Sequence, residues 1–192
     1  MGSGEVPYDR RQLIELLQRD SLKRGKFTLA SGRTSHYYVD GRKVTLSAAG
    51  AAVIGAGVLE RLEEYPEVAA VGGLTMGADP IVGATLALAG QGGRADFRGF
   101  LVRKEAKAHG TGSRIEGPLE PGTTVAILDD VATTGGSSLQ AVDAVQAIGC
   151  RVAVVIVVLD RLEGAAAAFE ARGLRFESLL TIRDLGVEQA NG

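Results

Sequence analysis

Apolar and polar positions recur with two different periods along the chain, and together they predict an α/β protein. Leucines between Asp9 and Leu22 follow a helical spacing, and Asp9 is suited to cap the N-terminus of that helix. Residues 26–44 carry aromatic and β-branched side chains between turn residues, which indicates short strands. From residue 48 onward, helical patterns alternate with short apolar runs. We expect helices at 48–64, 78–90, 139–148 and 164–172, and strands at 68–74, 100–102, 125–128, 152–159 and 176–182.

This alternation of strands and helices favours a parallel sheet with helices on both faces. The run Val152–Leu159 is uninterrupted and rich in β-branched residues, as is typical of a strand buried on both faces. The 192 residues are enough for one domain with a sizeable core. Ligands of such sheets bind beyond the carboxyl ends of the strands, so we look for the site there.

Composition and charge argue against several classes of protein. A net charge of −2 gives no reason to expect binding to nucleic acid or to a membrane surface. Tryptophan is absent and aromatic residues are scarce, so a base-stacking platform is not expected. Cys150 is the only cysteine, and with two histidines it leaves no zinc site of the usual kind. The longest apolar stretch is too short to span a membrane and no targeting segment is visible, so we expect a cytoplasmic protein.

Residues 125–138, with the sequence VAILDDVATTGGSS, carry the most chemical information. An apolar strand ends in Asp129 and Asp130, and hydroxyl and glycine residues follow before a helical pattern begins at Leu139. Free N–H groups and the dipole at a helix N-terminus favour an anion such as phosphate. Carboxylates repel phosphate, so we assign the two acids to the hydroxyls of a ribose on the same ligand. A simple capped turn would explain the serines and threonines, but not the acids beside them.

A second charged segment, RKEAKAHGTG, runs from Arg103 to Gly112. It gathers lysine, arginine and histidine within a few residues and continues into glycines. A solvated surface loop is the simpler interpretation of such a charge run. The flanking glycines favour a mobile lid, and its cations suit a pyrophosphate group.

These two segments resemble a known family. Residues 125–138 are similar to the phosphoribosyl pyrophosphate (PRPP) signature of the type I phosphoribosyltransferases, and residues 103–110 resemble the catalytic loop of the orotate phosphoribosyltransferase family. The resemblance extends from Leu13 to Leu185. It implies the type I phosphoribosyltransferase fold, an α/β fold in which a central, mainly parallel sheet is flanked by helices, with a small N-terminal hood. It also implies a single domain over residues 1–192, with the hood mainly from residues 1–45 plus a C-terminal segment and the core over residues 46–175.

The resemblance also implies roles for individual residues. The two acids hold the 2- and 3-hydroxyls of the PRPP ribose, and the loop after them holds the 5-phosphate. Lys104 acts in the site of its own chain, whereas Arg103, Lys107 and His109 reach into the partner's site. We therefore expect a homodimer with shared sites, PRPP and orotate as substrates, and Mg²⁺ held mainly by PRPP rather than by a metal site of the protein. The expected catalytic residues are Lys107, His109, Arg103, Asp129 and Asp130. The expected PRPP contacts are Arg103, Lys104, Lys107, His109, Asp129, Asp130, Val131, Ala132, Thr133, Thr134, Gly135, Gly136 and Ser137.

The base-binding residues follow from the same resemblance. Tyr37 and Tyr38 match an aromatic pair that covers the flat orotate ring, although on physical grounds such a pair is more often part of a core. Arg161 follows the buried strand, where a charged residue can simply end the strand. The resemblance assigns its guanidinium to the orotate carboxylate, a planar match, and Thr133 to a contact with the pyrimidine.

Two positions depart from the pattern. Ala30 and Met76 stand where enteric-type members carry lysine, so we assign a PRPP contact to neither residue, and residues 74–80 are at most a backbone contact for pyrophosphate. The activity implied is the Mg²⁺-dependent glycosyl transfer, more narrowly pentosyl transfer, of ribose 5-phosphate from PRPP to N1 of orotate in pyrimidine (UMP) biosynthesis. Two alternatives stay open, a phosphoribosyltransferase for another base and a non-catalytic regulator that senses PRPP. The complete lid, and a chain too short for an added DNA-binding domain, speak against the regulator.

Overall fold

The computed structural model describes residues 7–28, 34–105 and 114–187 of the chain. Six strands form the central sheet: β3 (Ala70–Leu74), β4 (Arg98–Val102), β5 (Ile115–Glu116), β6 (Thr124–Ala132), β7 (Arg151–Asp160) and β8 (Phe176–Thr181). Their order is β5-β4-β3-β6-β7-β8, and all neighbours are parallel except β5, which runs antiparallel to β4. The predicted α/β class with a mainly parallel sheet is therefore confirmed.

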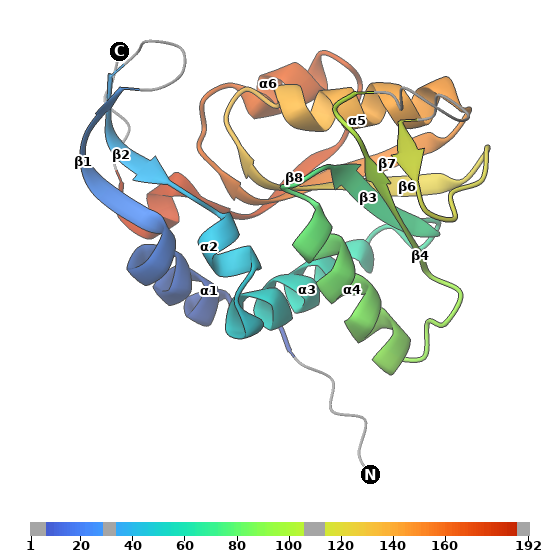
Figure 1. Ribbon diagram of the computed structural model, residues 1–192, viewed down its shortest axis with the longest axis horizontal. Helices are drawn as coiled ribbons and strands as arrows, with labels where there is room; N and C mark the ends of the chain where they lie inside the picture. The colour runs from blue at the N-terminus through green and yellow to red at the C-terminus, as the bar shows by residue number, and fades with distance from the viewer. Residues whose placement is uncertain (1–6, 29–33, 106–113, 188–192) are drawn as a thin grey trace.

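Helices cover both faces of this sheet. Figure 1 shows two of them, α5 and α6, on one face, and α1, α3 and α4 on the other. The helical elements are α1 (Arg10–Leu16), the π-helical turn η1 (Leu17–Ser21), α2 (Arg42–Thr45), α3 (Ala48–Leu62), α4 (Asp79–Gln91), α5 (Gly136–Ala147), α6 (Ala165–Glu170) and the 3-10 turn η2 (Ile182–Leu185). In the described residues no helix combines the length and the apolar character that crossing a membrane requires.

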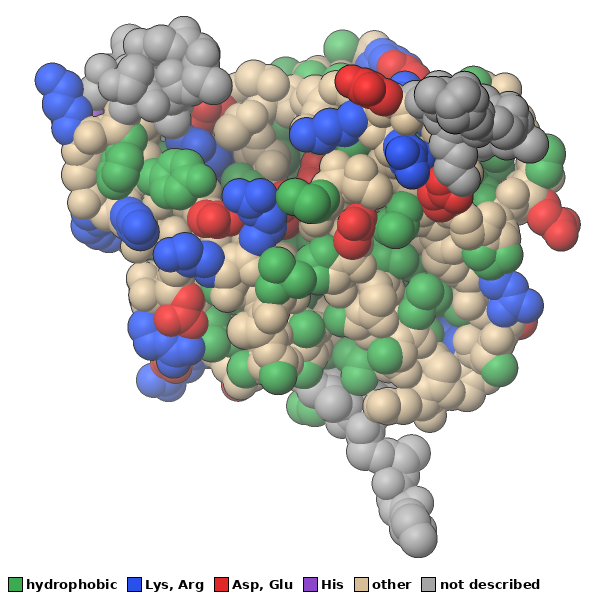
Figure 2. All heavy atoms as spheres, in the orientation of Figure 1, with side chains coloured by type: hydrophobic (Ala, Val, Ile, Leu, Met, Phe, Trp, Pro, Cys, Tyr) green, Lys and Arg blue, Asp and Glu red, His purple; other side chains and the backbone are tan. Residues whose placement is uncertain are grey.

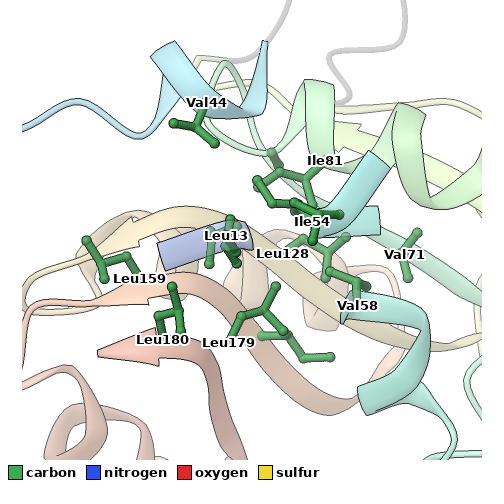
Figure 3. Packing of buried hydrophobic residues seen from close by; sticks show 14 of the residues in the cluster. Leu13, Val44, Ile54, Val58, Val71, Ile81, Leu128, Leu159, Leu179 and Leu180 are labelled. Carbon is green, nitrogen blue, oxygen red and sulfur yellow. The ribbon is translucent and has the colours of Figure 1, made fainter. Parts of the chain in front are cut away.

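The strands supply two cores at once, because successive side chains of a strand point to opposite faces. In β6, Ala126 and Leu128 belong to the core between the sheet and α1, α3 and α4. Val125 and Ile127 belong to the core on the opposite face, between the sheet and α5 and α6. A sheet covered on both faces therefore needs the unbroken apolar runs seen in the sequence. Figure 3 shows side chains of several elements meeting in the first core, among them Leu13, Ile54, Val58, Val71, Ile81, Leu128, Leu159, Leu179 and Leu180.

Beside the sheet stands an antiparallel hairpin of β1 (Leu22–Thr28) and β2 (Thr34–Val39), seen at the left of Figure 1. The sequence predicted a helix that runs to about Leu22, and the helical segment ends one residue earlier, at Ser21, because Leu22 already pairs with Val39 in the hairpin. The helix closes in η1, where the Ser21 hydroxyl donates to the Asp40 carbonyl at 2.7 Å. The predicted N-cap is confirmed, since the Asp9 carboxylate accepts from the Gln12 N–H at 3.0 Å.

The strand that carries the acid pair is longer than predicted. The sequence placed its end at Leu128, but β6 continues to Ala132, so both acids lie within the strand. The cause is the long neighbour β7, because Asp129 pairs with Val157 and Ala132 with Asp160. This pairing holds the backbone of the acid pair in extended form.

Candidate active site

A cleft of about 600 Å³ opens at the carboxyl edge of the sheet. Three of its walls follow strands, since residues 74–77 come after β3, 103–105 after β4, and 129–131 end β6. Residues 38–42, from β2 into α2, and Ser137 of α5 complete the lining. Parallel strands bring their carboxyl ends to one edge, which is why distant segments meet there. The face in Figure 2 carries lysine, arginine and acidic side chains close together in its upper half.

The two acids of β6 are held by local hydrogen bonds. Asp129 is only 5% exposed, and its carboxylate accepts from the Ser138 hydroxyl at 2.9 Å and from the Asp130 N–H at 3.0 Å. The Asp130 carboxylate accepts from the N–H of Val131 at 2.9 Å. These bonds fix both side chains in the wall of the cleft.

Burial raises the pKa of both carboxyl groups of this pair. Loss of water, and after it the charge of Asp130, raises the pKa of Asp129 to about 7, although the Ser138 hydrogen bond acts in the opposite direction. Burial also raises the pKa of Asp130, against the opposing effects of the Val131 N–H and of nearby Arg42. A carboxyl group that keeps its proton can donate a hydrogen bond as well as accept one, so a raised pKa suits contacts with the hydroxyls of a sugar.

The turn after β6 leads into α5 through Gly135. Its φ of +80° lies in the left-handed region, and a Cβ there would sit 2.9 Å from Phe169 Cζ, so both the backbone and the packing require glycine. No side chain of the described residues caps α5, and Gly136 and Ser137 at its start are exposed. The free N–H groups of this first turn therefore form a seat for an anion beside the acids.

The loop after β3 presses against the same acids. A Cβ on Gly77 would lie 2.6 Å from Asp129 Oδ1 and 2.8 Å from Asp130 Oδ1, so only glycine fits. The peptide bond between Thr75 and Met76 is cis. Met76 is 65% exposed at the rim of the cleft. It is the residue to which the sequence analysis assigned no PRPP contact.

The lid segment is anchored where it leaves the sheet. Arg103 and Lys104 line the cleft of their own chain with exposed side chains, which is the place expected for Lys104, whereas Arg103 was expected to act in the partner's site. The Arg103 N–H donates to the Arg114 carbonyl at 2.7 Å, and Arg114 Nε donates back to the Arg103 carbonyl at 2.9 Å. Lys107 and His109 lie outside the described residues, as does Ala30, so their assigned roles stay predictions.

The aromatic pair of β2 is divided between two environments, because neighbouring residues of a strand face opposite sides. Tyr38, 38% exposed, lines the cleft and its ring lies 5.8 Å from that of Phe27. Tyr37 points away from the cleft, toward the turn after β7. There its hydroxyl lies 3.3 Å from both Arg161 Nε and Glu163 Oε1. The predicted orotate contacts therefore do not all share one surface.

Thr133 and Arg161 do lie close together, because β6 and β7 end side by side. The Arg161 N–H donates to the Ala132 carbonyl at 2.9 Å, and the Thr133 carbonyl accepts from the Ala165 N–H at 3.1 Å. The sequence missed several residues of the site, namely Asp40, Gly41, Arg42 and Glu163, and it placed Ser138 among the hydroxyl donors of the loop without its partner Asp129. For Gly41 a signal existed, a glycine between a strand and a helix, and its Cβ would lie 3.0 Å from Asp130 Oδ2. The roles of Ser138 and Glu163 arise only from tertiary contacts.

Comparison with known proteins gives a consistent picture, although no family model matches the chain. The chain is 48% identical to the orotate phosphoribosyltransferase of Rhodopirellula baltica, over 98% of this chain and 100% of that protein. It is 50% identical to the protein of the same name from Thermosynechococcus vestitus, over 92% of each. Among solved structures, the orotate phosphoribosyltransferase of Mycobacterium tuberculosis in complex with PRPP superposes with a TM-score of 0.79 and 42% identity, over 93% of this chain and 99% of that one.

Proposed function

Because this chain belongs to the orotate phosphoribosyltransferase family, we propose that it transfers ribose 5-phosphate from PRPP to N1 of orotate in a Mg²⁺-dependent reaction. The products are orotidine 5-phosphate and pyrophosphate, a step of pyrimidine nucleotide synthesis. The observation that carries the proposal is the pair Asp129 and Asp130 in the cleft wall, directly before the glycine turn that begins α5. A ribose phosphate is a ligand that needs carboxylates and an anion seat side by side.

The 5-phosphate of PRPP is seated at the start of α5. Exposed Gly136 and Ser137 offer the free N–H groups of the first helical turn, and the hydroxyls of Thr133 and Thr134 add donors. The backbone of 131–132 leads from the acids to this seat. The ribose contacts and the phosphate contacts thus come from two consecutive parts of one loop.

Asp129 and Asp130 hold the two ribose hydroxyls. As the C1–O bond breaks, positive charge develops on the ribose ring, as in glycoside cleavage. A buried carboxylate whose pKa is about 7 is poorly stabilised as an anion, and nearby positive charge favours its ionised form. The acid pair therefore interacts more strongly with the transition state than with bound PRPP, which is what accelerates a reaction.

The leaving pyrophosphate is met by cations. N1 of orotate loses its proton and forms the new bond to C1, while the electron pair of the old C1–O bond leaves with pyrophosphate, an anion that can take up a proton. Lys104 at the cleft wall, together with Arg103, Lys107 and His109 from the second copy of the chain, stabilises that negative charge.

Mg²⁺ would enter this cleft with PRPP, whose oxygens are the hard ligands it prefers. Held mainly by PRPP, it would supply further neutralisation of the pyrophosphate charge. In the part of the chain that the structure describes, no three His, Cys, Asp or Glu side chains gather as a separate metal site.

Orotate lies on the cleft side of the hairpin, near the carboxyl ends of β6 and β7. Tyr38 presents its ring to the cleft, where it offers a flat surface for a pyrimidine. Arg161 takes the orotate carboxylate and Thr133 contacts the pyrimidine, while Tyr37 braces the aromatic pair from behind. A guanidinium fork suits a planar carboxylate because both partners are flat and pair through two hydrogen bonds.

We further propose a homodimer with shared sites, in which Arg103, Lys107 and His109 act in the cleft of the second copy. A second hollow beside the cleft supports this arrangement. It is lined by Leu46 and Met76, which are 72% and 65% exposed. Large apolar side chains gathered at one exposed place suit a surface that another protein covers.

The decisive experiment follows orotate absorbance after PRPP and Mg²⁺ are added to the purified protein. We expect a loss of absorbance that requires all three components and is matched by pyrophosphate release. Pyrophosphate release with a purine base but not with orotate would identify a phosphoribosyltransferase for another base. Tight PRPP binding without turnover of any base would identify a non-catalytic regulator.

A further inference from the structure

The turn between β7 and α6 is built to an unusual shape. Leu162 has a φ of +57°, and it is the one residue other than glycine with positive φ in the described ranges. Its N–H is fixed by the Asp160 carboxylate at 2.8 Å, and the preceding N–H of Arg161 donates to β6. A leucine in the left-handed region costs conformational energy, so surrounding contacts must hold the turn in place. This shape turns Arg161 and Glu163 toward the same neighbour, Tyr37.

These three side chains contact one another. Arg161 Nη2 lies 2.7 Å from Glu163 Oε1, and Arg161 Nε donates to the Tyr37 hydroxyl at 3.3 Å. The Tyr37 hydroxyl in turn donates to Glu163 Oε1 at 3.3 Å, and the guanidinium carbon lies 4.7 Å from the centre of the tyrosine ring. Arg161 is only 6% exposed. An ion pair with so little contact with water is screened weakly, so its geometry is well defined.

Arg161 and Glu163 both contact the hairpin through Tyr37, and Glu163 holds the other two side chains through the same oxygen, Oε1. Tyr37 belongs to the hairpin, whereas Arg161 and Glu163 belong to the sheet side of the molecule, and Figure 1 shows the hairpin standing beside the sheet. Because Tyr38 is the next residue of β2, fixing Tyr37 from behind also fixes where Tyr38 meets the cleft.

We propose that Glu163 is a positioning residue for base recognition, which orients the Arg161 guanidinium and holds β2 so that Tyr38 faces the base. This inference rests on the proposed function and deepens it. Glu163 does not touch the base or PRPP. Its negative charge also opposes a second carboxylate near Arg161, and we expect orientation to outweigh this repulsion, because a guanidinium binds a carboxylate well only in a defined plane.

The test is Glu163→Gln, which keeps the size of the side chain and removes its charge. We expect the KM for orotate to rise about tenfold, which corresponds to about 1.4 kcal/mol, because hydrogen bonds to charged groups have about this effect. The KM for PRPP should stay within about twofold of the wild type, since the PRPP contacts lie elsewhere in the cleft. Glu163→Asp, which restores the charge on a shorter side chain, should recover part of the loss.

Glu177→Gln is a matched control. The Glu177 carboxylate also accepts from a tyrosine hydroxyl, that of Tyr65, and also pairs with an arginine, Arg61. It lies near the start of β8, opposite Ile156, and not at the carboxyl end of the strand where Asp160 and the turn after β7 are found. Its loss should lower the melting temperature without a change in the KM for orotate. Equal effects of the two variants on both quantities would reduce Glu163 to a structural role and overturn the proposal.

A second variant, Tyr37→Phe, keeps the test open if Glu163→Gln fails to fold. It removes only the hydroxyl, so it should raise the KM for orotate as well, and the double variant should do no more than the larger single effect. An unchanged or lower KM for orotate in these variants overturns the proposal. Absence of orotate-dependent pyrophosphate release in the wild type would instead refute the proposed function, so the two failures are distinct.

Discussion

The Ser138 hydroxyl donates a 2.9 Å hydrogen bond to Asp129 Oδ2, and both side chains are almost completely buried. Ser138 lies in the first turn of α5 and Asp129 in β6, so the bond joins the anion seat to the strand that carries the acids. A hydroxyl that donates to a carboxylate stabilises the ionised form, and here it opposes the effect of burial on the pKa. Ser138 therefore adjusts the charge of a residue that we place on the ribose.

Replacing Ser138 by alanine should raise the pKa of Asp129 above its already raised value of about 7. If ionised Asp129 is needed for catalysis, the acidic limb of the pH profile of kcat/KM for PRPP moves upward by about one unit. Thr85→Val is the control, because the Thr85 hydroxyl is equally buried but donates to the Ile81 carbonyl within α4. A profile that coincides with the wild type would show that this hydrogen bond does not govern the charge of Asp129.

Asp129 should also make stability depend on pH. Its pKa in the folded protein, about 7, is above the ordinary value of 3.8, so between these values the folded state keeps a proton that the unfolded chain has released. The free energy of unfolding therefore falls as pH rises through this window. The side chain of Asp129→Asn cannot ionise, so this variant lacks that loss of stability. The difference in melting temperature, variant minus wild type, should therefore increase from about pH 5 to about pH 8. Calorimetry in a pH series measures this difference, and two parallel curves would contradict it.

Gly77→Ala should damage the site without unfolding the chain. The added methyl group would lie 2.6 Å from Asp129 Oδ1, so the loop or the acids must move apart. A displacement of about 1 Å costs about 100-fold in the rate of an oriented reaction, and we expect a loss of this order in kcat/KM for PRPP. Gly83→Ala is the control within α4, since its methyl group meets nothing within 4 Å. This control should raise the free energy of unfolding by about 0.5–1 kcal/mol and leave steady-state kinetics unchanged, whereas near-normal kinetics in Gly77→Ala would refute the tight fit.

The layers of the fold were predictable because a strand that is buried on both faces needs an unbroken run of apolar residues. The run Val152–Leu159 is apolar at every position, and β7 indeed feeds both cores. The acid pair and its glycine turn were predictable for a similar reason, since their chemistry is contained in one continuous loop. The end of β6 was placed wrongly, because polar residues normally close a strand and only the pairing with β7 carries it on to Ala132.

Contacts between segments far apart in the chain could not be predicted, because no local sequence pattern indicates them. Alternation along β2 predicts that Tyr37 and Tyr38 face opposite sides, but which side meets the cleft depends on how the hairpin packs. Glu163 is a charged residue in a turn, and its bond to Tyr37 joins positions 126 residues apart in the chain. The positive φ of Leu162 could not be predicted from the sequence either, because leucine is not a residue typical of such a turn.

The proposed sharing of sites between two copies makes a prediction about mixed dimers. Lys107→Ala damages the lid and Asp130→Asn damages the ribose contact, so each homodimer should have little activity. In a heterodimer whose lids act across the interface, one site combines the intact acids of the first chain with the intact lid of the second. Co-expression with two different tags and purification through both isolates this species.

The purified heterodimer should then recover about half of the wild-type activity per dimer, because one of its two sites is whole and the other carries both substitutions. If each site were built from a single chain, every site of the heterodimer would carry one substitution and activity would stay at the level of the homodimers. Leu46→Asp provides an independent check. A charge at this 72% exposed position should weaken the dimer, as measured by analytical ultracentrifugation. The activity per chain should then fall with dilution, because a shared site is lost when the copies separate. An activity per chain that stays constant while the dimer dissociates would contradict the sharing of sites.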